Sequence, residues 1–111
     1  MLKILIVDDE PDICELIHKL IDWEELKLTS LGSSQNGIDA MEIILRQKPD
    51  IVITDIQMPG MTGLEMIERA SQQKLQTKFI VISGYREFEY AQQAIRFGVE
   101  DYLLKPISKT D

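Results

Sequence analysis

The chain has 111 residues, which is the size of one domain and leaves no room for a second. Its hydrophobic fraction of 44% is ordinary for a globular protein, and its net charge of −7 argues against binding of DNA or an anionic membrane by this chain itself. The single cysteine excludes an intrachain disulfide, and the absence of a membrane-length apolar run or a signal-peptide pattern predicts a cytoplasmic protein.

Strand and helix patterns alternate in the first half of the chain. Residues 2–7 form a short apolar run, and Pro11 then opens a helix whose apolar residues recur at i, i+3, i+4 and i+7. Cys14 belongs to this apolar pattern, so we expect it to be structural. Residues 26–31 alternate and predict a second strand, and residues 40–45 mark a second helix that a proline ends.

The second half repeats this alternation. Residues 51–54 predict a third strand, and a helix follows whose apolar positions are Leu64, Ile67 and Ala70. Residues 79–82 predict a fourth strand, residues 88–95 a fourth helix, and residues 101–104 a fifth strand. The pattern indicates an α/β fold with a doubly wound, five-stranded parallel sheet. Right-handed crossovers and a reversal after the second strand give the strand order 2-1-3-4-5.

Charged residues follow three of the predicted strands. Asp8 and Asp9 follow the first strand, Asp55 follows the third, and Lys105 with Pro106 follows the fifth. Because the carboxyl ends of parallel strands meet at one edge of a sheet, we expect these groups to converge. The loops after strands one and three also flank the point where the strand order reverses, which is where such sheets bind ligands.

Three carboxylates and an ammonium group at one edge suggest metal and phosphate chemistry. Aspartates at close range repel each other, and a divalent cation removes this repulsion. Mg²⁺ typically binds one or two carboxylates and keeps sites for phosphate oxygens. Asp55 stands alone at its strand end, which suits a nucleophile, whereas the adjacent Asp8 and Asp9 suit metal binding. Solvated loop acids and a surface lysine are the alternative, but all four stand at predicted strand ends.

A family resemblance becomes specific when further residues are added. The motifs that carry it are Asp8-Asp9, Asp55, Met58-Pro59 with Gly63, Ser83 and Lys105-Pro106. Together they resemble the receiver domain of two-component response regulators, over residues 3–107. The resemblance implies a flavodoxin/CheY-like fold and a phosphoacceptor switch, not an enzyme with a separate substrate.

The resemblance also implies a role for each site residue. The ligands implied for Mg²⁺ (or Mn²⁺) are Asp8, Asp9, Asp55 and, through its backbone carbonyl, Gln57. Asp55 is implied as the phosphoacceptor, with Ser83 and Lys105 in contact with the phosphoryl group. Ser83 and Tyr102 are implied as the switch residues, which move inward after phosphorylation and change the surface of the fourth helix and fifth strand.

Three longer segments narrow the resemblance to regulators with an AraC-type helix-turn-helix output domain. These segments are residues 22–26, 83–91 and 101–107. The implied partners are a sensor histidine kinase and, through the same surface of the fourth helix and fifth strand, a second copy in a homodimer. Transcription regulation would use a DNA-binding domain that is missing from this chain. We expect this fragment itself to bind neither nucleic acid nor membrane.

The family's fold ends in a fifth helix after the Lys-Pro turn, and this sequence stops a few residues beyond that turn. We therefore expect residues 1–111 to be a receiver domain that is truncated at its C-terminal end, with the fifth helix absent or truncated. An apolar sheet face left bare in this way would favour association.

Two other functions fit part of the pattern. A Mg²⁺-dependent phosphohydrolase of the haloacid dehalogenase type also uses a strand-end aspartate, but it would have a second aspartate at position 57, where Gln57 stands. It usually also needs a cap domain. A pseudo-receiver that only binds proteins would lack part of the acid cluster, which is complete here, so it ranks second.

Overall fold

The structure of the protein is a computed structural model that describes residues 2–56, 58, 60–83 and 101–104. The elements in this part of the chain are β1 (Leu2–Val7), α1 (Pro11–Leu20), β2 (Leu28–Ser34), α2 (Gly37–Gln47), β3 (Ile51–Thr54), α3 (Gly63–Gln72), β4 (Lys78–Ser83) and β5 (Asp101–Leu104). The strands form one parallel sheet in the order β2-β1-β3-β4-β5, which confirms the predicted topology. The predicted fourth helix and the chain after Leu104, where a fifth helix is expected to be missing, lie outside the described residues.

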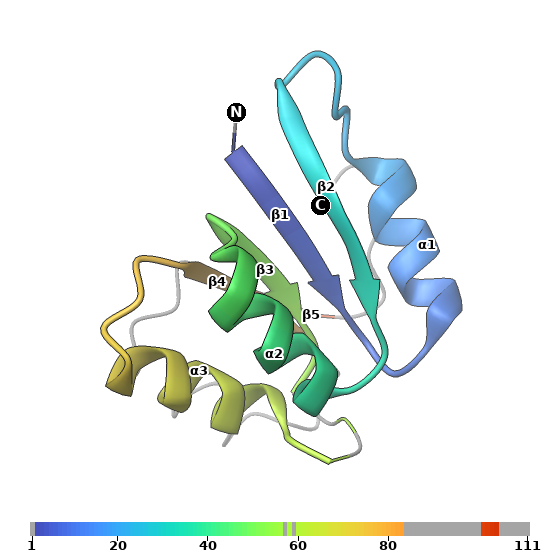
Figure 1. Cartoon of the computed structure of the whole chain (residues 1–111). Helices are drawn as coiled ribbons and strands as arrows, with labels where there is room; N and C mark the ends of the chain where they lie inside the picture. Colours follow the sequence, from blue (N-terminus) through green and yellow to red (C-terminus); the bar gives the residue numbers. More distant parts are fainter. Residues whose placement is uncertain (1, 57, 59, 84–100, 105–111) are drawn as a thin grey trace.

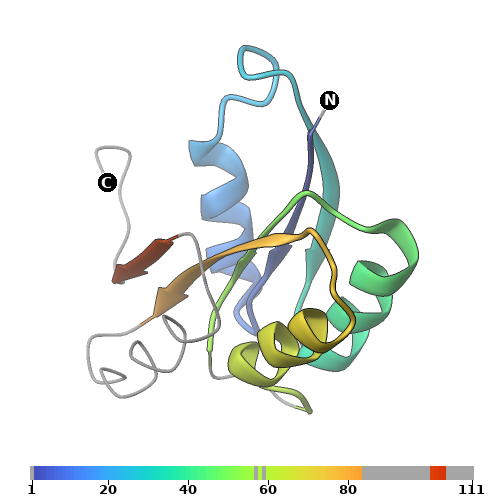
Figure 2. The same ribbon diagram turned by 90° about the vertical axis from the view of Figure 1, so that its left-hand side faces the viewer.

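Helices cover both faces of the sheet, with α1 on one face and α2 and α3 on the other (Figures 1 and 2). The residues of β1 alternate between two buried clusters. Leu5 and Val7 belong to the cluster under α2 and α3, whereas Ile4 and Ile6 belong to the cluster under α1. A central parallel strand buried on both faces reads as a continuous apolar run, which explains why β1 was predictable.

The helices begin where the sequence provides caps. Pro11 occupies the first turn of α1, as predicted. The Asn36 side chain accepts a hydrogen bond from the Asp39 N–H at the start of α2. Thr62 and Glu65 form a reciprocal capping box at the start of α3. Among the described residues, no helix is long and apolar enough to cross a membrane.

The second strand differs from its predicted bounds, residues 26–31. The chain first makes a hydrogen-bonded turn, in which the Leu26 N–H donates to the Asp22 carbonyl oxygen at 3.0 Å, and Lys27 has a positive φ of 56°. Strand pairing therefore starts at Leu28 and continues to Ser34. Gly32, with a φ of 91°, lies at a shift of register that lets the serines predicted as a loop pair with β1.

Asp50 joins three strands at the amino edge of the sheet, the side on which the parallel strands begin. Its carboxylate accepts a hydrogen bond from the Lys3 N–H at 2.7 Å, and its own N–H donates to the Lys3 carbonyl oxygen at 2.8 Å. Its carbonyl oxygen accepts from the Lys78 N–H at 2.9 Å. The starts of β1, β3 and β4 are thus joined through one residue.

Candidate functional site

Asp8 and Asp55 occupy neighbouring positions at the carboxyl edge of the sheet. Val7 pairs with Thr54 in the parallel ladder between β1 and β3, and each aspartate is the next residue of its chain segment. The Asp55 N–H donates to the Val7 carbonyl oxygen at 3.1 Å, and the Asp8 N–H donates to the Ser34 carbonyl oxygen at 3.0 Å. Both acids are therefore held by hydrogen bonds that extend the sheet.

These two carboxylates are withdrawn from water and are oriented by backbone donors. Asp8 is 1% exposed and Asp55 is 8% exposed. One carboxylate oxygen of Asp55 accepts from the Ile56 N–H at 2.7 Å, and one of Asp8 accepts from the Glu10 N–H at 3.0 Å. Buried carboxylates need hydrogen-bond partners in place of water. The local backbone N–H groups supply part of these bonds and limit the orientation of the two side chains.

Three adjacent acids can bring their oxygens together around one point. Among the described residues, carboxylate oxygens of Asp8, Asp9 and Glu10 lie within 4.8 Å of one another, and Asp55 is not a member of this group. Asp8 is buried, whereas Asp9 and Glu10 are exposed. A set made only of carboxylate oxygens fits a hard divalent cation such as Mg²⁺ or Mn²⁺.

Glu10 is the residue of this group that sequence reasoning missed. Its signal was its position directly after Asp8-Asp9, but it also precedes Pro11 and so occupies the N-cap position of α1. No side-chain hydrogen bond caps the helix there. An acid at a helix N-terminus has an ordinary electrostatic role, so the sequence alone gives no reason to group Glu10 with the two aspartates.

The loop after β3 folds back tightly against Asp55. The Gly63 N–H donates to the Ile56 carbonyl oxygen at 2.8 Å, and a Cβ atom added at Gly63 would lie 2.1 Å from the Asp55 carbonyl oxygen. The Thr54 hydroxyl donates to the same Asp55 carbonyl oxygen at 2.8 Å, and Met58 is buried beside it. Gly63 is therefore needed because the backbone carrying Asp55 leaves no room for a side chain.

The remaining predicted site residues are only partly described. Ser83 pairs with Leu104, and Tyr102 pairs with Val81, so the ends of β4 and β5 reach the same edge of the sheet as Asp55. The side chains of Ser83 and Tyr102 lie outside what the structure describes. Gln57 and Lys105 lie outside the described residues altogether.

The chain is similar to known proteins along almost its whole length. The family model of the response regulator receiver domain matches residues 4–111. The chain is 48% identical over 109 residues to the uncharacterized transcriptional regulatory protein YesN of Bacillus subtilis, covering 98% of this chain and 30% of that protein. It is 35% identical over 107 residues to the transcriptional regulatory protein HptR of Staphylococcus aureus, covering 96% of this chain and 42% of that protein.

The fold agrees with solved structures of the same family. The receiver domain of AraT, a response regulator from Geobacillus stearothermophilus, has a TM-score of 0.90 and 44% sequence identity, covering 98% of this chain and 84% of that chain. The chain therefore spans less than half of the curated relatives but most of a receiver domain solved by itself. Family match, strand order and acid-lined edge agree: the chain belongs to the response regulator receiver domain family.

Proposed function

We propose that Asp55 is the phosphoacceptor of this chain and takes its phosphoryl group from the phosphohistidine of a sensor kinase. A carboxylate oxygen of Asp55 attacks phosphorus, the N–P bond of the phosphohistidine breaks, and the imidazole nitrogen keeps the electron pair. The product is an acyl phosphate on Asp55. The observation that carries this proposal is the pairing of Val7 with Thr54, which sets a buried Asp55 beside Asp8 at the carboxyl edge.

A divalent cation, Mg²⁺ or Mn²⁺, belongs to this proposal. Asp8, Asp9, Asp55 and the backbone carbonyl of Gln57 would hold it, and it would neutralise charge on the phosphoryl oxygens when bound. The group of carboxylate oxygens formed by Asp8, Asp9 and Glu10 supports this assignment. We further propose that Glu10 strengthens cation binding through its charge.

The phosphoryl group then acts as a switch. Ser83 and Lys105 would contact its oxygens, and Tyr102 would turn inward with Ser83. The strand register supports this role, because β4 and β5 end at the same edge as β3. The added charge would change the surface formed by the predicted fourth helix and β5, which is where we propose that a second copy binds.

The wider function follows from the relatives and is proposed on that basis. YesN and HptR are named transcriptional regulatory proteins, and this chain spans 30% and 42% of them. We propose that a DNA-binding domain, of the AraC type, reads the switch in the whole protein. A kinase partner and a DNA target would both be reached in the cytoplasm, where we propose that this reaction takes place.

Phosphorylation by acetyl phosphate tests the assignment of Asp55. The protein is incubated with acetyl phosphate and Mg²⁺, and the product is followed on Phos-tag gels and by intact-mass spectrometry. We expect one phosphoryl group on the wild type and none on Asp55→Ala. Asp50→Ala is the matched control, because Asp50 flanks the same strand at its other end, and it should be modified like the wild type. Equal modification of wild type and Asp55→Ala would overturn the proposal.

A further inference from the structure

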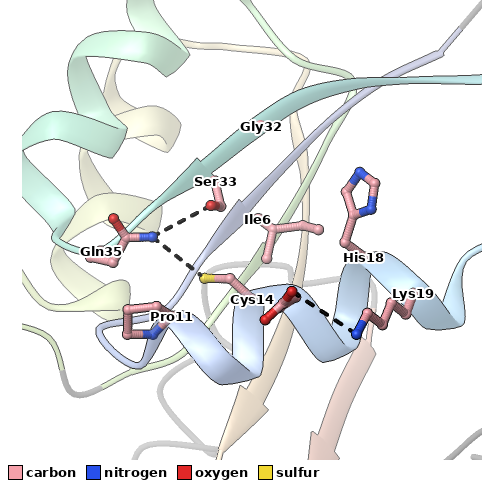
Figure 3. Close-up of a pocket in the computed structure, with 9 residues that line it drawn as sticks. Ile6, Pro11, Cys14, His18, Lys19, Gly32, Ser33 and Gln35 are labelled. Atoms are coloured by element: carbon pink, nitrogen blue, oxygen red, sulfur yellow. Dashed lines mark hydrogen bonds and ion pairs between the residues drawn. The ribbon is translucent and has the colours of Figure 1, made fainter.

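A pocket of about 380 Å³ lies between α1 and the edge strand β2 (Figure 3). Its lining includes Pro11, which directly follows the acidic loop, residues 8–10, between β1 and α1. Cys14 lines it from α1, and Ser33 and Gln35 line it from the end of β2 and the residues that follow. Cys14 is 3% exposed, and burial raises the pKa of its thiol. A thiol S–H is a weak hydrogen-bond donor, so a buried Cys14 can bond to a carbonyl oxygen within its reach.

The Cys14 thiol touches the backbone of Asp8. Its Sγ lies 3.5 Å from the Asp8 carbonyl oxygen and 4.0 Å from the Ser34 carbonyl oxygen, both within the range of a sulfur hydrogen bond. The Gln35 amide donates to Sγ at 3.9 Å and to the Ser33 hydroxyl at 3.4 Å (Figure 3). One thiol thus joins the first turns of α1, the end of β1 and the end of β2.

These contacts act on the peptide unit that joins Asp8 to Asp9. The Asp8 N–H is already fixed by the Ser34 carbonyl oxygen, and the thiol acts on the other side of the residue, at its carbonyl. The orientation of that carbonyl sets the plane of the next peptide and thereby the directions in which both acidic side chains leave the backbone. Metal ligands need to be held within about 0.5 Å of the productive geometry, so a shift of this peptide reaches the metal site.

We propose that Cys14 and Gln35 are positioning residues for the metal-binding acids, and that they couple the packing between α1 and β2 to metal affinity. They touch neither the cation nor the phosphoryl group and act through the backbone of Asp8. The inference rests on the proposed function, because it takes Asp8 as a metal ligand. It adds that the edge strand β2, which carries no proposed site residue, controls how well the acidic loop binds a cation.

Titration of Mg²⁺ by isothermal calorimetry tests this coupling without any phosphorylation. We expect Cys14→Ala to bind Mg²⁺ about threefold to tenfold more weakly than the wild type. This loss is smaller than the roughly 10–100-fold that is typical for residues that orient metal ligands, because a thiol is a weak donor. Cys14→Ser restores a donor and should return to within about twofold of the wild type. Gln35→Ala should weaken binding less than Cys14→Ala, because its bond to sulfur is longer.

Ile17→Val is the matched control for loss of packing. Ile17 lies on the same helix and in the same buried cluster as Cys14, and it lines no part of the pocket. Thermal melts of all variants establish that they are folded and give their stabilities. Ile17→Val should melt a few degrees below the wild type and still bind Mg²⁺ like the wild type. Equal Mg²⁺ affinities for Cys14→Ala and wild type, or an equal loss in Ile17→Val, would overturn the inference.

A reciprocal measurement uses the fact that Cys14 is the single cysteine of the chain. If the thiol supports the metal-bound geometry, saturating Mg²⁺ should slow its reaction with a thiol reagent severalfold, because coupling between two sites acts in both directions. The slowing should vanish in Asp55→Ala. An unchanged rate in a protein that binds Mg²⁺ contradicts the coupling alone, whereas a wild type that binds no Mg²⁺ contradicts the proposed metal site.

Discussion

Asp50 and Asp55 lie at opposite ends of the same strand, β3, and their carboxylates have different partners. The Asp50 carboxylate accepts a hydrogen bond from the backbone of β1, at Lys3, and the residue's own backbone bonds to both neighbouring strands. The Asp55 carboxylate accepts from the next residue of its own loop, Ile56. Asp50 thus joins strands, whereas Asp55 lies at the carboxyl edge, where the loops after β1 and β3 begin.

The two edges of the sheet differ in the same way. At the amino edge, three turns into strands contain a lysine with a positive φ, namely Lys27, Lys48 and Lys74. At the carboxyl edge, the loops carry Asp8, Asp9, Glu10 and Asp55. Repulsion between acids opposes folding, and a bound cation or a basic group offsets it. The end of the strand at which an aspartate lies, and not its residue type, therefore decides whether it joins strands or faces the candidate site.

Gly63→Ala should produce the largest effect, because the added side chain collides with the backbone of Asp55. The new Cβ would lie 2.1 Å from the Asp55 carbonyl oxygen, so the backbone has to move. We expect a loss of about 3 kcal/mol in the free energy of unfolding and a marked fall in the rate of phosphorylation. Urea denaturation and the acetyl phosphate assay measure the two effects.

Gly32→Ala is the control for this substitution. Gly32 has a φ of 91°, but a Cβ added there would meet nothing within 4 Å. The cost should therefore be conformational, about 1 kcal/mol, with a much smaller fall in phosphorylation than in Gly63→Ala. Equal losses at the two glycines would mean that the backbone around Asp55 is not tightly packed.

Asp50→Ala should separate stability from function. Its removal deprives the Lys3 N–H of its carboxylate acceptor and should lower the free energy of unfolding by about 1–3 kcal/mol. Asp55, the proposed phosphoacceptor at the other end of β3, should keep its reactivity per folded molecule. Chemical denaturation measures the change in stability. A separate phosphorylation assay, carried out well below the melting temperature, measures the reactivity of the folded variant. A large loss of phosphorylation in this folded variant would show that Asp50 also supports the candidate site, which contradicts the difference between the two edges.

Glu10→Gln should weaken Mg²⁺ binding by about twofold to fivefold, because it removes one negative charge near the proposed metal ligands. The effect is limited because Glu10 is exposed, so that water and salt screen the interaction. The effect should shrink as the salt concentration rises. Glu15→Gln, on the exposed surface of α1, is the matched control and should change the affinity less. Calorimetric titrations at two ionic strengths make the measurement, and identical affinities for both variants would remove Glu10 from the site.

Lys48→Gly should give the smallest effect, and it should be a gain. Lys48 ends α2 with a φ of 49°, a backbone conformation in which glycine avoids the steric cost of a Cβ atom. We expect the free energy of unfolding to rise by about 0.5–1 kcal/mol, with Mg²⁺ affinity unchanged. Thermal and urea denaturation check the gain, and a destabilised variant would show that the lysine side chain has a role at the amino edge.

Much of the fold was predictable because the central strands are apolar on both faces. The bounds of β1, β3 and β5 agree with the predictions, and the strand order followed from general rules of chain connection. The bounds of β2 were wrong because two features override its alternating pattern. One is the hydrogen-bonded turn before Leu28, and the other is the shift of register at Gly32.

The candidate site was predictable to a smaller extent. Asp8 and Asp55 each follow a predicted strand, and neighbouring parallel strands end on the same side of a sheet. The sequence therefore predicted that these two residues lie close together, which the pairing of Val7 with Thr54 agrees with. Glu10 was missed because its approach to Asp8 and Asp9 depends on how the chain passes from β1 into the first turn of α1. The contact between Cys14 and the Asp8 carbonyl was equally hidden, because a cysteine in an apolar helical pattern gives no sign of what its sulfur touches.

The shift of register at Gly32 also affects how the protein meets its neighbours in solution. β2 is an edge of the sheet, and an edge strand offers backbone groups to any other chain that can pair with it. An irregular, twisted edge rich in serine is a poor template for such pairing, because an incoming strand cannot keep its hydrogen bonds in step past the extra residue. The same glycine that brings Ser33 and Ser34 into the sheet thus helps protect the protein from aggregation along this edge.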